Sequence, residues 1–205
     1  MIIKNAKFVT SVGETKRINE FNLPEIAVAG RSNVGKSSFI NYLVNFRGLA
    51  KVSSTCGKTR LLNYFLINDE FYMVDLPGYG FAKVSNMEKE RWANLIETYI
   101  ITSKNLKLVL CLLDIRHIPN QNDKQLINFL QFNNIPFIII ATKCDKLSKA
   151  QRAIARQKIA TELEIGRDDI IVTSAEKQIG KEEALAKIES FLKFNKEILS
   201  ESICD

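Results

Sequence analysis

Residues 30–37, with the sequence Gly-Arg-Ser-Asn-Val-Gly-Lys-Ser, could bind the phosphates of a nucleotide. They match the pattern G-x-x-x-x-G-K-[ST] and lie between an apolar run and an amphipathic one, the context that this pattern requires. The glycines allow a tight turn that points backbone N–H groups at phosphate oxygens, and the following helix would add its positive end. Lys36 would bring charge to the β- and γ-phosphates, and Ser37 would offer a hydroxyl to Mg²⁺. The motif indicates a nucleoside triphosphate without specifying the base.

Residues 75–78, Asp-Leu-Pro-Gly, follow the apolar residues 71–74 and could complete the phosphate site. An acid at the end of a strand can bind Mg²⁺, directly or through water, beside a phosphate loop. Gly78 could offer a backbone N–H to the γ-phosphate. By itself this pattern is common in turns, but its position downstream of Lys36 makes it informative.

Residues 142–145, Thr-Lys-Cys-Asp, follow a second apolar run and could recognise a base. Asp145 could accept hydrogen bonds from the N1–H and the exocyclic amine of guanine, whereas adenine would leave that carboxylate poorly paired. The stem of Lys143 could lie over the base, and the backbone of residues 173–175, Thr-Ser-Ala, could contact guanine O6. One such element alone indicates a solvated turn, but four in this order predict a site for GTP or GDP.

The polar residues 48–59 lack periodicity and read as a long loop, and loops of this length are usually functional. Thr59 is the candidate for a second Mg²⁺ hydroxyl that senses the γ-phosphate, with Thr55 as its competitor. Hydrolysis would release these contacts. The residue after Gly78 is Tyr79, where Ras-like enzymes place a glutamine that orients the attacking water, so we expect slow intrinsic hydrolysis.

The elements that must position these residues alternate between short apolar and longer amphipathic segments. This alternation predicts an α/β fold with a mainly parallel central sheet flanked by helices. With the phosphate and base motifs, the chain resembles a three-layer P-loop NTPase of the Ras-like G-domain type. The strands expected are residues 25–29, 61–67, 70–74, 106–113, 135–141 and 169–172, with residues 7–10 as a candidate edge strand. The helices expected are one ending near residue 44 and residues 87–101, 122–132, 148–163 and 181–194. We expect an N-terminal extension over residues 1–23, a G domain over 24–197 and a C-terminal tail over 198–205.

Composition limits the partners and the cellular location that we expect for this domain. The chain has 205 residues, of which 46% are hydrophobic, and a net charge of +6, which suggests an anionic partner such as RNA or a membrane surface. The four cysteines and single histidine do not form a zinc motif. No apolar run approaches the roughly 20 residues that span a membrane, so we expect a cytoplasmic protein without membrane insertion.

Together these segments resemble the EngB family of bacterial GTPases, in the TrmE–Era–EngA–EngB–Septin-like group. The resemblance is carried by residues 29–38, 57–65, 75–84, 113–117 with Asp123, and 142–147, and it extends from about residue 8 to about residue 195. It implies a GTP-hydrolysing switch that binds the large ribosomal subunit and its rRNA in a GTP-dependent way during assembly. Family members have also been linked to division septum formation.

The resemblance also implies roles for individual residues. Asparagine at the position of Asn33 ligates K⁺ near the phosphates in related GTPases, so K⁺ is a candidate cofactor besides Mg²⁺. The catalytic candidates are Lys36, Thr59 and Asn33, and the metal ligands are Ser37, Thr59 and Asp75. The residues assigned to the nucleotide are Gly30, Arg31, Ser32, Asn33, Val34, Gly35, Lys36, Ser37, Ser38, Gly57, Lys58, Thr59, Arg60, Leu61, Asp75, Leu76, Pro77, Gly78, Thr142, Lys143, Cys144, Asp145, Thr173, Ser174 and Ala175. Cys56 and Arg60 stand where the family commonly has proline and glutamine.

Two clusters of positive charge could contact rRNA. One lies in the long loop of residues 48–59 and directly beside it, at Arg47, Lys51, Lys58 and Arg60. The other consists of Lys149, Arg152 and Arg156, which share one face of an expected helix. The alternative for the helix cluster is a solvated face.

Other functions stay open from the residues alone. A P-loop kinase would need an acceptor pocket and a lid, for which no insertion is visible. A septin-like or membrane-associated scaffold would need a coiled-coil tail or a lipid-binding helix. We expect a monomer that does not bind DNA. For residues 114–117, which include His117, we expect a structural role at a strand's end or a contact with the segment after Gly78, rather than a catalytic role.

Overall fold

The computed structural model describes residues 1–51, 61–79 and 86–201, and within these ranges seven strands form one sheet. The strand order is β1-β3-β4-β2-β5-β6-β7. The strands are β1 (Ala6–Val12), β2 (Glu25–Gly30), β3 (Leu62–Ile67), β4 (Phe71–Asp75), β5 (Leu106–Asp114), β6 (Phe137–Thr142) and β7 (Ile170–Val172).

The centre of the sheet is parallel and one side of it is antiparallel. Strand β2 pairs in parallel with both β4 and β5, and β5, β6 and β7 continue in parallel. Strands β3 and β4 form a hairpin whose turn residues, Asn68 and Asp69, both have positive φ, as a type I′ turn requires. Because parallel strands end at the same edge, the segments that follow β2, β4, β5, β6 and β7 meet there.

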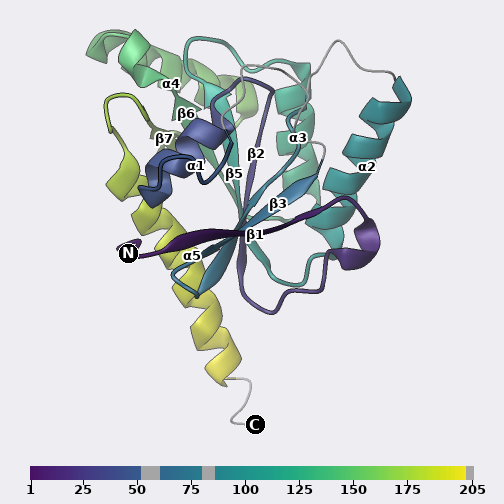
Figure 1. The fold of residues 1–205 in the computed structure, drawn as a ribbon. Helices are drawn as coiled ribbons and strands as arrows, with labels where there is room; N and C mark the ends of the chain where they lie inside the picture. Colours follow the sequence, from purple (N-terminus) through teal and green to yellow (C-terminus); the bar gives the residue numbers. More distant parts are fainter. Residues whose placement is uncertain (52–60, 80–85, 202–205) are drawn as a thin grey trace.

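Five helices in the described residues cover the two faces of the sheet (Figure 1). They are α1 (Lys36–Val44), α2 (Asn86–Thr102), α3 (Gln121–Phe132), α4 (Lys149–Leu163) and α5 (Lys181–Glu201). Alternate residues of β2 show the layering: Ile26 and Val28 pack in a cluster with α1 and α5, whereas Ala27 and Ala29 pack in one with α2, α3 and α4. The predicted three-layer, mainly parallel architecture is confirmed.

Helices α3 and α4 begin where local sequence satisfies their first backbone N–H groups. Asn120 accepts from the backbone of Asp123 while the Asp123 side chain accepts from the backbone of Asn120, a capping box. Ser148 and Gln151 make the same reciprocal pair at α4. Both helices therefore start immediately after the strand-end loops that line the site.

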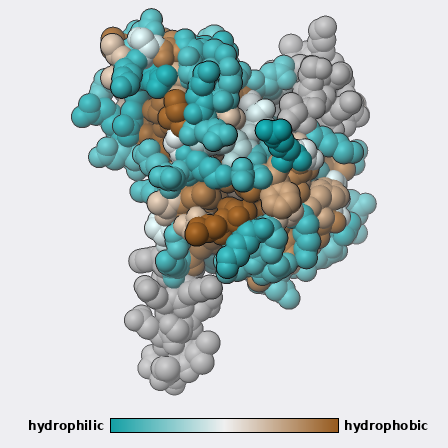
Figure 2. All heavy atoms as spheres, turned by 60° about the vertical axis from the view of Figure 1, so that its left-hand side comes forward, coloured by the Kyte–Doolittle hydropathy of each residue, from teal (hydrophilic) through white to brown (hydrophobic). Residues whose placement is uncertain are grey.

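The candidate edge strand near the N-terminus is confirmed, whereas the last helix is longer than the sequence predicts. Strand β1 lies at the edge of the sheet against β3, and the N-terminal ammonium of Met1 pairs with Glu189 of α5. Helix α5 continues to Glu201 rather than ending at residue 194, so the expected tail begins inside a helix. In the described residues, no helix is long and apolar enough to cross a membrane. Figure 2 shows one face that is largely hydrophilic, with apolar residues gathered in patches between the polar ones.

Candidate nucleotide-binding site

The phosphate loop is a tight turn between β2 and α1. Asn33 and Gly35 have φ of 65° and 107°, and α1 begins directly afterwards at Lys36. A side chain at Gly30 would bring its Cβ within 2.9 Å of Val34 Cγ1 and 3.0 Å of the Leu112 carbonyl oxygen, so only glycine fits there. The loop and the start of α1 therefore form the anion-binding turn that the sequence predicts.

Asp75, the last residue of β4, faces this loop. The Lys36 Nζ lies 3.8 Å from its Oδ1, and that oxygen is buried without a hydrogen-bond partner. Burial raises the pKa of Asp75, and this effect outweighs the lowering by Lys36 and by a hydrogen bond from Asn63. A carboxylate oxygen that lacks a donor suits Mg²⁺, which prefers hard oxygen ligands, so Asp75 together with Ser37 fits this ion.

Gly78 and Tyr79 pack against the phosphate loop. A Cβ on Gly78 would lie 2.9 Å from Ser32 Oγ, and the Ser32 backbone N–H donates to the Tyr79 carbonyl oxygen at 3.1 Å. The Tyr79 hydroxyl donates to Asp123 Oδ1 at 3.0 Å, and Arg31 Nε lies 3.5 Å from the other oxygen of Asp123. The tyrosine thus ties the segment after β4 to the start of α3.

The base-recognition elements are linked to one another and to the phosphate loop. Thr142 Oγ1 lies 3.0 Å from the carbonyl oxygens of both Val34 and Leu113. The Cys144 backbone N–H donates to the Thr173 carbonyl oxygen at 3.1 Å. These bonds join the ends of β5, β6 and β7 to the loop after β2.

Asp145 is held as an ionised acceptor. Its Oδ1 accepts from the Ser174 hydroxyl at 2.6 Å, and its Oδ2 lies 3.0 Å from Lys146 Nζ. The Ser174 hydrogen bond lowers the pKa of Asp145 more than burial raises it. A carboxylate kept charged here can accept the two guanine N–H groups that adenine lacks.

Several predicted residues contribute differently from expectation. Leu76 is fully buried in the core and its N–H donates to Val28, so it supports β4 rather than offering its side chain or N–H to a ligand. The side chains of Cys144 and Thr173 are also buried, and the backbone N–H and carbonyl groups of both residues hydrogen-bond within the protein. Leu61 lies over Gly13. The predictions for Thr55, Cys56, Gly57, Lys58, Thr59 and Arg60 lie outside the described residues.

Two of the three basic residues of α4 that were predicted to contact rRNA also make structural hydrogen bonds. Arg152 Nε donates to the carbonyl oxygens of Cys144 and Leu147 at 2.7 and 3.0 Å. Arg156 Nε donates to the Arg167 carbonyl oxygen at 3.0 Å. Sequence spacing places these arginines on one helix face, but it does not reveal the carbonyl groups of other segments that occupy them.

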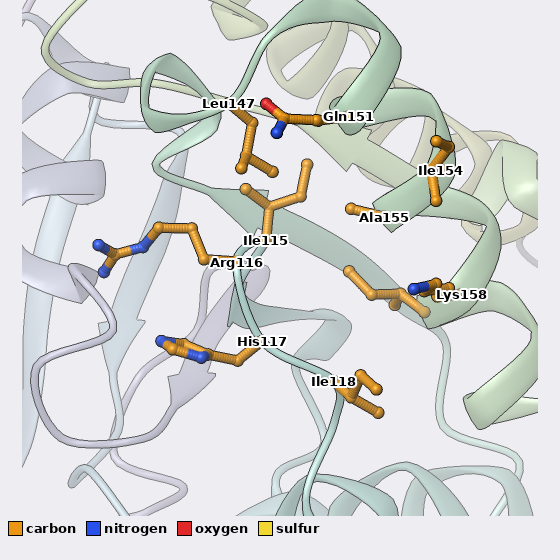
Figure 3. Close-up of a pocket in the computed structure, with 10 residues that line it drawn as sticks. Ile115, Arg116, His117, Ile118, Leu147, Gln151, Ile154, Ala155 and Lys158 are labelled. Atoms are coloured by element: carbon orange, nitrogen blue, oxygen red, sulfur yellow. The ribbon is translucent and has the colours of Figure 1, made fainter.

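Two residues near the base site, Asp114 and Arg116, belong to a segment for which the sequence predicts a structural role at a strand's end or a contact with the segment after Gly78. Arg116 hydrogen-bonds both oxygens of Asp114, at 2.9 and 2.7 Å, and Lys143 Nζ lies 3.0 Å from Asp114 Oδ2. The same loop, with His117, lines a hollow of about 350 Å³ against α4 (Figure 3). The signal was an acid at the end of an apolar strand followed two residues later by an arginine.

Comparison with known proteins agrees with this geometry. Residues 25–143 match the protein family described as "50S ribosome-binding GTPase". A "Probable GTP-binding protein EngB" from Bacillus subtilis is 46% identical over 196 residues, covering 94% of this chain and 99% of that protein. A protein of the same name from Pelotomaculum thermopropionicum is 47% identical over 189 residues, covering 92% of this chain and 96% of that protein.

Solved structures show the same fold. A crystal structure of a probable GTP-binding protein engB has a TM-score of 0.70 at 24% identity, covering 82% of this chain and 98% of that one. Era in complex with MgGDPNP and nucleotides of 16S ribosomal RNA has a TM-score of 0.64 at 23% identity, covering 83% of this chain and 57% of that one. With its nucleotide site and these near full-length relatives, the chain belongs to the EngB family of GTP-binding proteins and is a P-loop GTPase.

Proposed function

We propose that this GTPase is a switch that assists assembly of the large ribosomal subunit and binds it in a GTP-dependent way, most directly through rRNA. The observation that carries the proposal is the match of residues 25–143 to a family described as binding the 50S ribosome. A structure with the same fold, that of Era, was solved with 16S ribosomal RNA. The net charge of +6 favours an anionic partner.

The phosphate site supports Mg²⁺ as the resident cofactor. Ser37 and Asp75 would hold it with the phosphates, and Thr59 would add a hydroxyl in the GTP state. Bound there, Mg²⁺ would neutralise charge on the phosphates and on the buried Asp75 carboxylate. Asn33 would hold K⁺ beside the phosphates; turnover that is equal in KCl and NaCl would contradict this.

Co-sedimentation tests the ribosomal role. Purified large subunits are mixed with the full chain and GDP, or with a non-hydrolysable GTP analogue, and pelleted at increasing salt. We expect retention with the analogue, little with GDP, and a steep fall with salt because phosphate contacts release counterions. Small subunits and an Asp145→Ala variant serve as controls. Equal retention with both nucleotides, or retention that ignores salt, would contradict the proposal.

The remaining roles follow from this one. We propose that the chain acts in the cytoplasm as a monomer, without binding DNA or inserting into a membrane, and that an effect on septation arises through ribosome supply. Residues 24–197 would form the working G domain, with residues 1–23 and 198–205 as its extensions. A septin-like or membrane scaffold would instead float with anionic liposomes. Membership of a GTPase family argues against a P-loop kinase.

A further inference from the structure

The end of β5 carries a charged cluster that joins the base site to the phosphate loop. Asp114 lies directly beside Thr142 in the parallel register of β5 and β6, so the next residue of the chain, Lys143, starts next to the Asp114 carboxylate. The Lys143 Nζ lies 3.0 Å from Asp114 Oδ2 and 3.0 Å from the Asn33 carbonyl oxygen. One ammonium therefore bridges the acid at the end of β5 and the backbone of the phosphate loop.

The backbone of Lys143 has a restricted conformation. Its backbone has φ of 61°, in the left-handed region, and it caps the short helix Cys144–Lys146. A Cβ placed on Gly35 would lie 3.9 Å from its Cε, so the lysine stem runs alongside the glycine of the phosphate loop. A lysine stem has several rotatable bonds, and its direction depends on what holds the ammonium.

The Asp114 carboxylate is placed to hold the Lys143 ammonium. Its side chain is only 7% exposed, and it accepts from Arg116 through the backbone N–H at 3.1 Å, through Nε at 2.9 Å and through the terminal nitrogen at 2.7 Å. Burial alone would raise the pKa of Asp114, but the hydrogen bonds from Arg116 and Lys143 outweigh it and lower the pKa. The hydrogen bonds from Arg116 and Lys143 thus favour the ionised form of this carboxylate without any ligand.

Arg116 lies on the solvent-exposed side of the cluster. Its side chain is 40% exposed and, in Figure 3, it points away from the α4 residues that line the hollow. The guanidinium hydrogen-bonds both oxygens of the Asp114 carboxylate, and it therefore restricts rotation of that group. A lone pair of Oδ2 remains for Lys143. The contribution of Arg116 to Lys143 is therefore indirect.

We propose that Asp114 is a positioning residue for the guanine nucleotide: clamped by Arg116, it fixes the Lys143 side chain across the phosphate loop, where the lysine stem can lie over the base. This inference rests on nucleotide binding and not on the ribosomal role, because it is tested on the isolated chain. The competing account is that Asp114 only closes its own turn, in which the His117 N–H donates to the Asp114 carbonyl oxygen.

A double-mutant cycle separates these accounts. The dissociation rate of fluorescent mant-GDP is measured at fixed Mg²⁺ for wild type, Asp114→Asn, Lys143→Met and the double variant. We expect Asp114→Asn to accelerate dissociation about tenfold, the size of one lost charge-assisted hydrogen bond. In the Lys143→Met background, the same change should alter the rate by less than about twofold, because its target is gone.

The matched control is Glu162→Gln, which removes a carboxylate from the exposed pair with Lys124 at 2.6 Å between α3 and α4. It should leave the rate unchanged. Effects of Asp114→Asn and Lys143→Met that multiply, or a folded Asp114→Asn with the wild-type rate, would overturn the proposal.

Arg116→Gln keeps the inference testable if Asp114→Asn does not fold. It leaves the Asp114–Lys143 pair in place but removes the clamp, so we expect an acceleration of about threefold, less than for loss of the pair. That acceleration should disappear in the Lys143→Met background. An unchanged rate in Arg116→Gln, or the same acceleration in both backgrounds, would overturn the proposal.

Discussion

Two buried carboxylates at the same edge of the sheet, Asp75 and Asp114, differ in what the protein supplies to them. Asp114 accepts hydrogen bonds from Arg116 and Lys143, and its pKa is lowered. Asp75 keeps an oxygen without a donor, has its nearest cation at 3.8 Å, and its pKa is raised. In the base half of the site, the part near Asp114, the protein's own donors therefore satisfy the carboxylate. In the phosphate half, the part near Asp75, the carboxylate is suited to a bound cation.

This contrast separates residues that position from residues that bind. A carboxylate satisfied by the protein can hold other side chains in place, at no further cost when nucleotide arrives. A carboxylate that is buried and underpaired is costly in the free protein and gains most when Mg²⁺ and phosphates bind.

The largest effect is expected in the base half. Asp145→Asn should weaken GDP binding roughly 1000-fold, because the asparagine NH₂ group would face a guanine donor and the remaining hydrogen bond would lose its charged acceptor. Xanthine has a carbonyl oxygen in place of the guanine amine, so the asparagine amide should partly restore binding of xanthosine diphosphate. Titration calorimetry with both nucleotides measures this, and equal loss for the two would contradict the assigned geometry.

The next effect concerns Mg²⁺ in the phosphate half. In the wild type, millimolar Mg²⁺ should slow GDP dissociation by about 10- to 100-fold, the range for one or two interactions with a charged group. Asp75→Asn should remove most of that slowing and leave the rate in EDTA nearly unchanged. Stopped-flow release of mant-GDP with Mg²⁺ or EDTA measures both rates. Full Mg²⁺ dependence in the variant would contradict the role of Asp75.

The two carboxylates should also respond oppositely to pH in the nucleotide-free protein. The pKa of Asp75 is raised in the native state above its ordinary 3.8, so wild type should lose stability relative to Asp75→Asn as pH rises above 3.8. The pKa of Asp114 is lowered from 3.8, so its stabilisation is complete above that value and is lost only as pH falls below it.

Urea unfolding between about pH 4.5 and 7.5, in EDTA, tests this difference. The stability gap between wild type and Asp75→Asn should grow with pH in the direction that favours the variant. The gap for Asp114→Asn should stay constant and favour wild type by about 1–3 kcal/mol, the cost of leaving a buried polar group poorly paired. A gap for Asp75→Asn that does not change with pH would remove the contrast.

The smallest effect is expected at Tyr79. Tyr79→Phe removes the hydroxyl that donates to Asp123 and should lower the free energy of unfolding by about 1 kcal/mol. GTP hydrolysis should change by less than about twofold, because the hydroxyl points to α3 rather than to the phosphates. Single-turnover hydrolysis measures this rate; a tenfold loss would place Tyr79 in the reaction.

Much of the fold and the nucleotide site follows from contiguous sequence. The phosphate loop at residues 30–37 and the segment 142–145 are short, and each carries its own backbone requirement, such as the positive φ of Gly35. Element boundaries follow less directly from contiguous sequence, because helix ends do not depend on an apolar pattern alone, and α5 extends to Glu201 rather than to residue 194.

By itself the sequence determined the class of fold, the order of the nucleotide motifs and guanine as the base, because each depends on residues adjacent in the chain. Only the tertiary structure decided which charged and polar groups pair across the molecule. Arg152 reaches carbonyl groups outside its helix, Tyr79 reaches Asp123, and Lys143 reaches both Asp114 and the phosphate loop. Those pairs depend on strand register and helix placement, which bring together residues that are far apart in the chain.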